Sequence, residues 1–429
     1  SDIRLTLYRD KAAWCPYCQK VWIMLEEKKI PYRIVHINMT SYGEKPQEFL
    51  KNTLNGKLPA IELDGDFHTD SVYIMQLIDD TFSEFAPVMA PKEHVERAQE
   101  LFDLEREVYG MWSLFLFQNP VWYKYRKWAE PPMKGFYESL DKVDDQLRRS
   151  WEESDKKSVW FLAGDAPSFI DLQFITHFER MVASAVYWKA IKIRDPQKWP
   201  HIDRWMSAFE ERESYQATRS DHYTHVMNIP PQCGEAYPDI NNERGVREAM
   251  NFIGGASWWY PAESQRPSGS RMQGDSWALP LSNTHDSWEP IPKPMQKSQQ
   301  DASSEAAYMI IKNHKAISLF ACRGTGQRGS PAYKAPLADP CAKPNLDHQE
   351  DVDKLLRITA SGLLNGQLVA SDDVCLNGLD ADAETRQDLS KCVRYLRDRI
   401  GVPRDMSLPA AQVLRAHLTH LSQLLLTGA

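Results

Sequence analysis

Two cysteines near the start of the chain, Cys15 and Cys18, have the spacing of a thiol–disulfide site. They lie between an apolar segment, residues 3–8, and an amphipathic one, residues 19–28, so we expect a strand-to-helix junction there. Pro16 suits the first helical turn, where a missing N–H leaves no intrahelical bond unmade. The positive end of that helix favours a thiolate on Cys15, the form that attacks sulfur. Cys18 lies one turn further on the same face, within reach of a disulfide.

Half of a zinc site is the alternative interpretation of this pair. Tetrahedral zinc takes four ligands, so a second ligand pair is needed. The other cysteines are scattered and form no second Cys-x-x-Cys: Cys233, Cys322, Cys341, Cys375 and Cys392. We therefore favour redox chemistry over metal binding and predict no metal site.

Length and composition limit the class of protein. A chain of 429 residues is long enough for two or three domains. Its net charge of −8 and pI near 5.9 argue against a protein that binds nucleic acid. The modest, odd number of cysteines fits a reducing compartment. The sequence contains no apolar run long enough to span a bilayer and no recognisable targeting segment.

Residues 1–85 alternate between strand and helix patterns. Asp64-Gly65 predicts a hairpin turn between two strands. The expected strands are 3–8, 32–37, 59–63 and 67–69, and the expected helices are 16–29 and 71–82. The order βαβ, α, ββ, α predicts a thioredoxin-like α/β domain.

Residues 86–225 are predicted to form an all-helical domain. Helical periodicity covers residues 92–117, 133–153, 168–188 and 201–213. Ser168 and Asp171 resemble a capping box at the start of the third helix, with Asp in place of Glu or Gln. We interpret this pair as a folding device and not as chemistry.

The last two hundred residues differ in character. Residues 226–300 are rich in Pro, Gly and Ser but also in Trp, which predicts an irregular arm packed onto the folded body. Residues 301–429 are predicted to be a mostly helical extension domain. Its expected elements are a helix at 304–314, a strand at 316–322, helices at 351–364 and 384–400, and a last helix capped by Ser407.

Four separated motifs occur in the order found in glutathione transferases: Cys15-Pro16-Tyr17-Cys18, Leu58-Pro59, Asp70-Ser71 and Ser168-x-x-Asp171. Residues 1–215 resemble the cysteine-type members of that family. The glutaredoxin-like Cys-Pro-Tyr-Cys motif and the long extension are most similar to the iota class of photosynthetic organisms. Residues 395–407 resemble the extension of that class. The expected fold class is thus a thioredoxin-like α/β domain, an all-α transferase domain and a mostly α extension.

The resemblance implies glutathione as co-substrate and Cys15 as the catalytic cysteine. Pro59 matches the family's cis-proline, and Asp70 with Ser71 matches the pair that holds the γ-glutamyl group. Lys57 could pair with a glutathione carboxylate, with a solvated surface lysine as the alternative. The implied glutathione-binding residues are Lys57, Leu58, Pro59, Asp70 and Ser71.

A cysteine in this position is expected to exchange disulfides. Cys15 would take glutathione from a glutathionylated substrate, and a second glutathione would release it. Cys18 could instead resolve the adduct as an internal disulfide. The leading hypothesis is therefore a glutathione-dependent thiol transferase or reductase, with dehydroascorbate reduction as a parallel activity. The alternatives are a glutathione-conjugating transferase, or a flavin- or ligand-binding protein built on a transferase body.

Aromatic residues are the candidates for the acceptor site: Trp122, Tyr123, Tyr125 and Trp128. Neighbouring positive charges would let this cluster accept a broad, flat, acidic molecule. The acceptor would be either a small molecule or the thiol or disulfide of a protein. Helix packing is the alternative for the cluster and the favoured interpretation for Trp112.

Gly324, Gly326 and Gly329 fit a Gly-x-Gly-x-x-Gly pattern after the predicted strand at 316–322. Pro331 and Pro336 follow too closely for a Rossmann unit. The residues considered for a nucleotide or flavin are Arg323, Gly324, Gly326 and Arg328. The iota resemblance makes FAD or FMN a candidate cofactor.

The same resemblance implies a chloroplast location, with the cytoplasm as the alternative. It leaves open whether the protein is a monomer or a homodimer.

Overall fold

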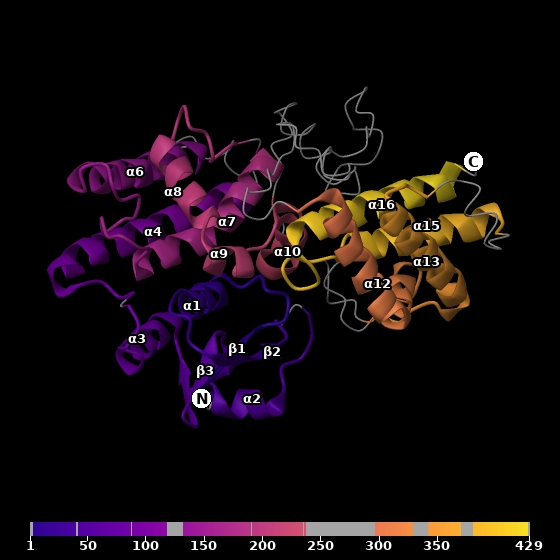
Figure 1. The fold of residues 1–429 in the computed structure, drawn as a ribbon, viewed down its shortest axis with the longest axis horizontal. Coiled ribbons are helices and arrows are strands. Elements are labelled where there is room, and N and C mark those ends of the chain that lie inside the picture. Colours follow the sequence, from indigo (N-terminus) through magenta and orange to yellow (C-terminus); the bar gives the residue numbers. More distant parts are fainter. Residues whose placement is uncertain are drawn as a thin grey trace, which may run out of the picture. The chain divides into compact units, whose positions relative to one another are not determined.

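The chain folds into two compact units, which are described separately below. The first comprises residues 1–229 and 233–248, and the second comprises residues 230–232 and 249–429. The computed structural model (Figure 1) describes residues 3–39, 42–86, 88–117, 132–189, 191–234, 236, 297–327, 329, 342–369 and 381–427.

The first unit begins with a four-stranded sheet. Its strands are β1 (Leu5–Asp10), β2 (Tyr32–Ile37), β3 (Ala60–Leu63) and β4 (Asp66–Thr69), in the order β2-β1-β3-β4. Strand β1 pairs parallel with β2 and antiparallel with β3, and β3 pairs antiparallel with β4. The predicted thioredoxin-like topology is confirmed.

Three helices complete this domain: α1 (Pro16–Glu27), α2 (Gln47–Asn52) and α3 (Ser71–Thr81). The predicted turn at Asp64-Gly65 joins β3 to β4, and both residues have positive φ, 53° and 97°. Residues at the carboxyl end of β1 lead directly into α1. The cysteine pair therefore lies at the predicted strand-to-helix junction.

The described residues of the rest of the first unit are mostly helical, as predicted for residues 86–225. The helices are α4 (Val95–Phe117), α6 (Pro132–Glu153), α7 (Phe169–Lys189), α8 (Pro200–Glu210), α9 (Glu213–Thr218) and α10 (His222–Cys233). Helix α7 is buried along its whole length from Ile170 to Lys189. It contacts both α4 and α1, so this one helix connects the helical domain to the start of the thioredoxin-like domain.

The start of α7 shows how the predicted capping pair works. Asp171 accepts hydrogen bonds from the backbone N–H and the hydroxyl of Ser168, at 2.9 and 2.8 Å. Its other oxygen accepts from the N–H of Phe161 and from Nε1 of Trp205, at 3.1 and 3.0 Å. The serine hydroxyl thus donates to the acid, and the buried carboxylate organises the chain around the helix start.

The described part of the second unit is a helical cluster, with α12 (Gln299–Ala321), α13 (Gln349–Asn365), α15 (Ala383–Arg397) and α16 (Leu408–Thr427). The predicted apolar face of α16 is confirmed, since Leu414, Leu418, Leu421 and Leu425 are all buried in the common core. Helix α13 ends where predicted, with Gly366 in the left-handed region at φ 66°.

Two expectations for the later residues are wrong. Residues 316–321 belong to α12 and not to a strand, because a short apolar run carries no periodicity that separates the two. Residues 226–233, expected in an irregular arm, are helical in α10, with Pro230 and Pro231 inside the helix. Most of the predicted arm, residues 237–296, lies outside the described residues.

Among the helices of the described residues, none combines the length and apolar character that crossing a membrane requires.

Replacing Asp171 with Ala should lower the free energy of unfolding by about 3 kcal/mol, because buried N–H donors lose their acceptor. Urea unfolding followed by tryptophan fluorescence measures this loss. Asp145→Ala is the matched control, since Asp145 is exposed on α6 and accepts only from Arg148 among the bonds described. The control should change stability by less than about 0.5 kcal/mol. Equal effects of the two substitutions would contradict the role of Asp171.

Candidate active site

Cys15 and Cys18 occupy the first turn of α1. Cys15 is the N-cap, Pro16 follows as the first helical residue, and the carbonyl of Cys15 accepts from the N–H of Gln19 at 3.0 Å. Both cysteines are buried free thiols, 5% and 1% exposed. Their order along the helix places Cys15 at the positive end and Cys18 further inside.

The two thiols are electrostatically unequal. Burial raises the pKa of the Cys18 thiol well above its usual value, and a hydrogen bond to Cys15 and the charges of Cys15 and Asp10 raise it further. Cys18 therefore keeps its proton at neutral pH and donates it toward Cys15. In this arrangement Cys18 is the hydrogen-bond donor and Cys15 the acceptor; the catalytic role of Cys15 stays a prediction.

Asp10 at the end of β1 is a buried carboxylate beside the thiols that the sequence analysis missed. Its Oδ2 accepts from the backbone N–H of Trp14 at 2.6 Å, whereas Oδ1 has no hydrogen-bond partner among the described residues. A carboxylate oxygen of Asp10 and the sulfurs of Cys15 and Cys18 lie within 4.8 Å of one another. A charged residue closing an apolar strand was the signal in the sequence.

The same three side chains could in principle hold a metal ion. Tetrahedral zinc takes four ligands, and in the described part of the chain this group supplies three, Asp10, Cys15 and Cys18. The absence of a metal site stays a prediction.

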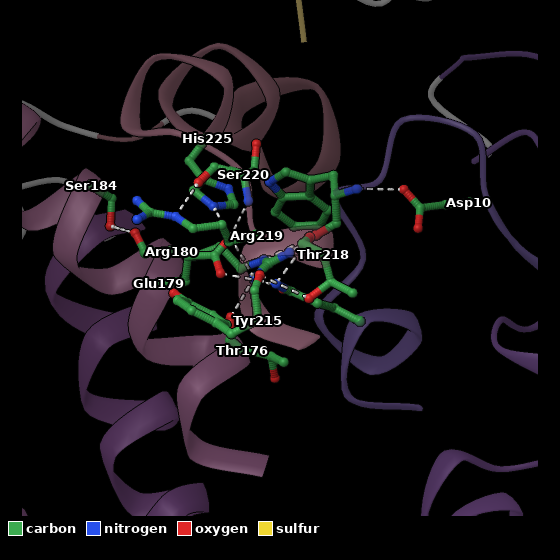
Figure 2. A network of polar contacts seen from close by, with 12 residues as sticks. Asp10, Thr176, Glu179, Arg180, Ser184, Tyr215, Thr218, Arg219, Ser220 and His225 are labelled. Atoms are coloured by element: carbon green, nitrogen blue, oxygen red, sulfur yellow. Dashed lines mark hydrogen bonds and ion pairs between the residues drawn. The ribbon is translucent and has the colours of Figure 1, made fainter. Parts of the chain in front are cut away.

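Arg180 of α7 fixes the backbone around the cysteine pair (Figure 2). Its Nε and Nη2 donate to the carbonyl of Trp14 at 2.9 and 2.5 Å, and its Nη1 donates to Oε1 of Gln19 at 2.6 Å. Trp14 precedes Cys15 and Gln19 follows Cys18. One buried guanidinium thus holds both ends of the motif, in the planar, multiply donating geometry that arginine provides.

Glu179, next to Arg180, completes this network (Figure 2). Its Oε2 accepts from Nε2 of Gln19 at 2.9 Å, and its Oε1 accepts from the N–H of Ser220 at 2.8 Å and lies 2.7 Å from Nε2 of His225. Burial favours the neutral form, but the hydrogen bond and charge of His225 and the neighbouring arginines outweigh it and lower the pKa of Glu179 to about 2. The ionised carboxylate compensates the buried charge of Arg180.

Two lysines bring positive charge toward the thiols, and the sequence analysis missed both. Lys20 is buried in α1 and donates to Oε1 of Gln173 at 2.5 Å. Burial lowers the pKa of Lys20 to about 8, against the opposing charges of Glu105, Asp70 and Cys15. Burial also lowers the pKa of Lys45, against the charges of Cys18 and Cys15. Lys20 lies in the segment predicted to form an amphipathic helix, whereas Lys45 carries no signal in the sequence.

The structure places Leu58 and Pro59 just before β3. The peptide bond between them is cis, as the resemblance predicted. Pro59 is buried, and Leu58 packs against a small core of Ile37, Phe49 and Ala60. Lys57 is exposed.

Asp70 and Ser71 lie at the start of α3. Asp70 is the N-cap, with φ 72°, and its Oδ1 accepts from the N–H groups of Val72 and Tyr73 at 3.0 and 3.1 Å. Its Oδ2 takes part in neither bond. The charge of Asp70 also acts on Lys20. The predicted roles of Asp70 and Ser71 in binding glutathione stay predictions.

The predicted acceptor cluster, Trp122, Tyr123, Tyr125 and Trp128, lies outside the described residues. Trp112 packs inside the helical domain, as favoured, and its Nε1 donates to Oγ of Ser184 at 2.9 Å.

Two tyrosines that the sequence analysis did not propose approach Cys15. Tyr17 and Tyr109 both contact the ring of His177, edge-on and tilted respectively, with ring centroids 5.4 and 4.8 Å away. Burial raises the pKa of Tyr17 to about 12, with the charge of Cys15 among the further causes.

The glycines proposed for a nucleotide serve backbone packing in the second unit. A Cβ at Gly324 would lie 2.7 Å from the carbonyl oxygen of Lys391, and one at Gly326 would lie 1.8 Å from that of Lys343. They follow a helix and not a strand, which corrects the expected strand-to-loop arrangement. Arg323 lies over the ring of Phe320, 5.3 Å from its centroid. Arg328 lies outside the described residues.

Replacing Arg180 with Lys keeps the charge but removes the forked donation to Trp14. We expect the free energy of unfolding to fall by about 2 kcal/mol and the reaction of Cys15 with a small disulfide reagent to slow about tenfold. Stopped-flow labelling and urea unfolding measure the two effects. Arg148→Lys on the exposed face of α6, where Arg148 pairs with Asp145 and Glu152, is the control and should change neither. Unchanged labelling of Arg180→Lys would contradict the positioning role.

Comparison with known proteins finds matches within the first unit. Residues 11–86 match the glutathione S-transferase N-terminal domain, and residues 127–208 match the glutathione S-transferase C-terminal domain. Three relatives are plant proteins. Glutathione S-transferase DHAR2 of Arabidopsis thaliana is 24% identical over 206 residues, which are 48% of this chain and 84% of that protein. Glutathione S-transferase DHAR3, chloroplastic, of the same plant is 26% identical over 219 residues, 49% of this chain and 71% of that protein.

The third relative, probable glutathione S-transferase DHAR2, chloroplastic, of Oryza sativa subsp. japonica, is 33% identical over 216 residues. These make up 49% of this chain and 66% of that protein. All three similarities cover about half of the chain. Together with the thioredoxin-like sheet and the helices that follow it, the matches show that residues 11–86 and 127–208 are similar to the N-terminal and C-terminal domains of glutathione S-transferases.

Proposed function

We propose that the protein is a glutathione-dependent thiol transferase or reductase whose nucleophile is Cys15. The observation that supports this most is the inequality of the two thiols. Cys15 caps the positive end of α1, while Cys18, with its raised pKa, donates a hydrogen bond to it. A thiolate in such surroundings attacks sulfur readily.

The first step moves glutathione from the substrate to the enzyme. The Cys15 thiolate attacks the glutathione sulfur of a glutathionylated substrate, forms an S–S bond to glutathione, and breaks the bond to the substrate. The substrate leaves as a thiolate and takes a proton from solvent. A second glutathione thiolate then attacks the same glutathione sulfur. Glutathione disulfide leaves, and Cys15 returns as thiolate.

Cys18 offers a second way to release the glutathione. It must first lose its proton, and the unpartnered Oδ1 of Asp10 is the nearby buried acceptor. The Cys18 thiolate would then attack Cys15 and release glutathione as thiolate. Because the pKa of Cys18 is well above its usual value, this route is the slower one at neutral pH.

The residues predicted to bind glutathione suit a tripeptide with two carboxylates and one ammonium. Leu58, before the cis-proline Pro59, would bond the cysteinyl amide through its backbone. Asp70 would take the ammonium through Oδ2, and Ser71 would receive a carboxylate at the start of α3. Lys57 would add a cation at the rim.

The finer parts of the proposal rest on the same resemblance. Membership of the iota class rests on the Cys-Pro-Tyr-Cys motif and the long extension, and it brings the chloroplast as the proposed location. Dehydroascorbate is proposed as a parallel acceptor. Conjugation is a weaker alternative, because a cysteine in place of a hydroxyl exchanges disulfides instead of activating glutathione. A flavin role has no support from Gly324 and Gly326, which pack against backbone.

Cys15→Ser should abolish deglutathionylation. Cys18→Ser should keep the rate of deglutathionylation within a few-fold of the parent rate, because one thiol completes the glutathione route. A coupled assay of glutathione disulfide with a glutathionylated peptide measures both. Cys233→Ser, an exposed cysteine at the end of α10, is the control and should behave as the parent. Turnover that survives in Cys15→Ser would refute the assignment.

Asp10→Asn should slow formation of the Cys15–Cys18 disulfide at least about tenfold, because the amide cannot accept the Cys18 proton. Single-turnover release of glutathione from glutathionylated enzyme, without added glutathione, measures this step. In a Cys18→Ser background, Asp10→Asn should change the rate of glutathione-dependent turnover by no more than about twofold. The reference is the Cys18→Ser variant itself. An equal loss in both backgrounds would mean that Asp10 acts through Cys15 or through the fold.

A further inference from the structure

A second pair of cysteines lies in the C-terminal unit. Cys322 follows the last residue of α12, and Cys392 lies in α15. Both are free thiols with 0% of their surface exposed. Neither has a part in the glutathione site proposed above.

Local backbone packing brings the two residues together. Cys322 opens the 3-10 turn η6 (Cys322–Gly324), which packs directly against α15. The N–H of Asn345 donates to the carbonyl of Cys322 at 3.0 Å and holds the turn. A Cβ at Gly324 would lie 2.9 Å from Cα of Cys392, so only a glycine allows this close approach.

The two thiols contact each other. They share a hydrogen bond, which raises the pKa of Cys322 as the donor and lowers that of Cys392 as the acceptor. The hydroxyl of Thr325 is a further partner of Cys392, with Oγ1 3.4 Å from Sγ. Cys392 is therefore the sulfur of the pair that ionises first, with Cys322 in direct contact as the second thiol.

We propose that Cys322 and Cys392 form a second redox site, a buried dithiol that glutathione disulfide oxidises to an internal disulfide. The Cys392 thiolate attacks one sulfur of glutathione disulfide, and one glutathione leaves as thiolate. Cys322 then gives its proton to solvent and attacks the Cys392 sulfur, and the second glutathione leaves. The cysteine pair loses two electrons and two protons, and one glutathione disulfide becomes two glutathiones.

Burial sets the kinetic character of this site. Neither sulfur has exposed surface, so exchange requires η6 to separate from α15 for a moment. Oxidation should therefore be slower than at Cys15, and the disulfide, once formed, is shielded from reduction. The bond would tie the end of α12 to α15, two helices that enclose one core, and so stabilise the unit against unfolding.

The test uses the full chain with Cys15→Ser and Cys18→Ser, so that the outcome is independent of the proposed function. The reduced protein is incubated in glutathione–glutathione disulfide mixtures of graded ratio, alkylated, and digested with trypsin without reduction. We expect a cross-linked pair of peptides, residues 316–323 joined to residues 392–394, and an intact mass lower by two hydrogens. Alkylation of both peptides at every ratio, a lasting glutathione adduct on either, or a cross-link to Cys341 or Cys375 overturns the proposal.

Matched variants separate a redox site from a buried apolar pair. In the same background, Cys392→Ala and Cys322→Ala should each abolish the cross-link, and Cys233→Ser should leave its yield unchanged. Glutathione disulfide should raise the midpoint of thermal unfolding of the C-terminal unit in the background protein and not in Cys392→Ala. An equal rise in both proteins, or none in either, contradicts the proposal. The background protein keeps both cysteines of the pair, so the result does not depend on whether an alanine variant folds.

Discussion

The donation from Arg180 to the carbonyl of Trp14 is the contact on which the thiol site depends. The loop between β1 and α1 has no regular partner for that carbonyl, and a buried guanidinium supplies two donors to it. A third donor of Arg180 reaches Gln19 beyond the cysteine pair. The cysteines are therefore positioned by the helical domain as much as by the sheet. This explains why α7 is buried from end to end although it carries none of the reacting atoms.

Buried charge around the site is balanced within a few residues. Arg180 is paired with Glu179, whose pKa stays low despite burial because His225 and the arginines favour its ionised form. Lys20 lies near the charges of Glu105, Asp70 and Cys15. Burying ions is costly unless each has a partner, so these residues specify one arrangement of α1 against α7. The positive field at the thiols comes from the end of α1 and from the two lysines, and the buried carboxylate of Asp10 opposes it.

The sequence predicted what local patterns and motifs encode. The alternation of residues 3–8, the turn at Asp64-Gly65 and the periodic helices led to the correct topology. The cysteine pair was placed correctly at the start of α1. Arg180 and Lys45 were missed because their roles arise from contacts between distant segments, which spacing does not reveal. Asp10 was missed although its contacts are local and a charged residue closing an apolar strand was visible in the sequence. The prediction of a strand at 316–322 was wrong for a different reason. Helix α12 extends through this apolar run, which is too short to show whether its hydrophobic period is that of a helix or a strand.

The proposed chemistry requires Cys15 to be the sulfur that first receives glutathione. Peptide mapping of the full chain after brief exposure to limiting glutathione disulfide tests it most directly, because tryptic peptide 12–20 holds both active-site cysteines and fragmentation separates them. We expect the first glutathione on Cys15, with Cys18 unmodified or later joined to Cys15. A first adduct on Cys18, or on Cys233 with peptide 12–20 unchanged, would contradict it.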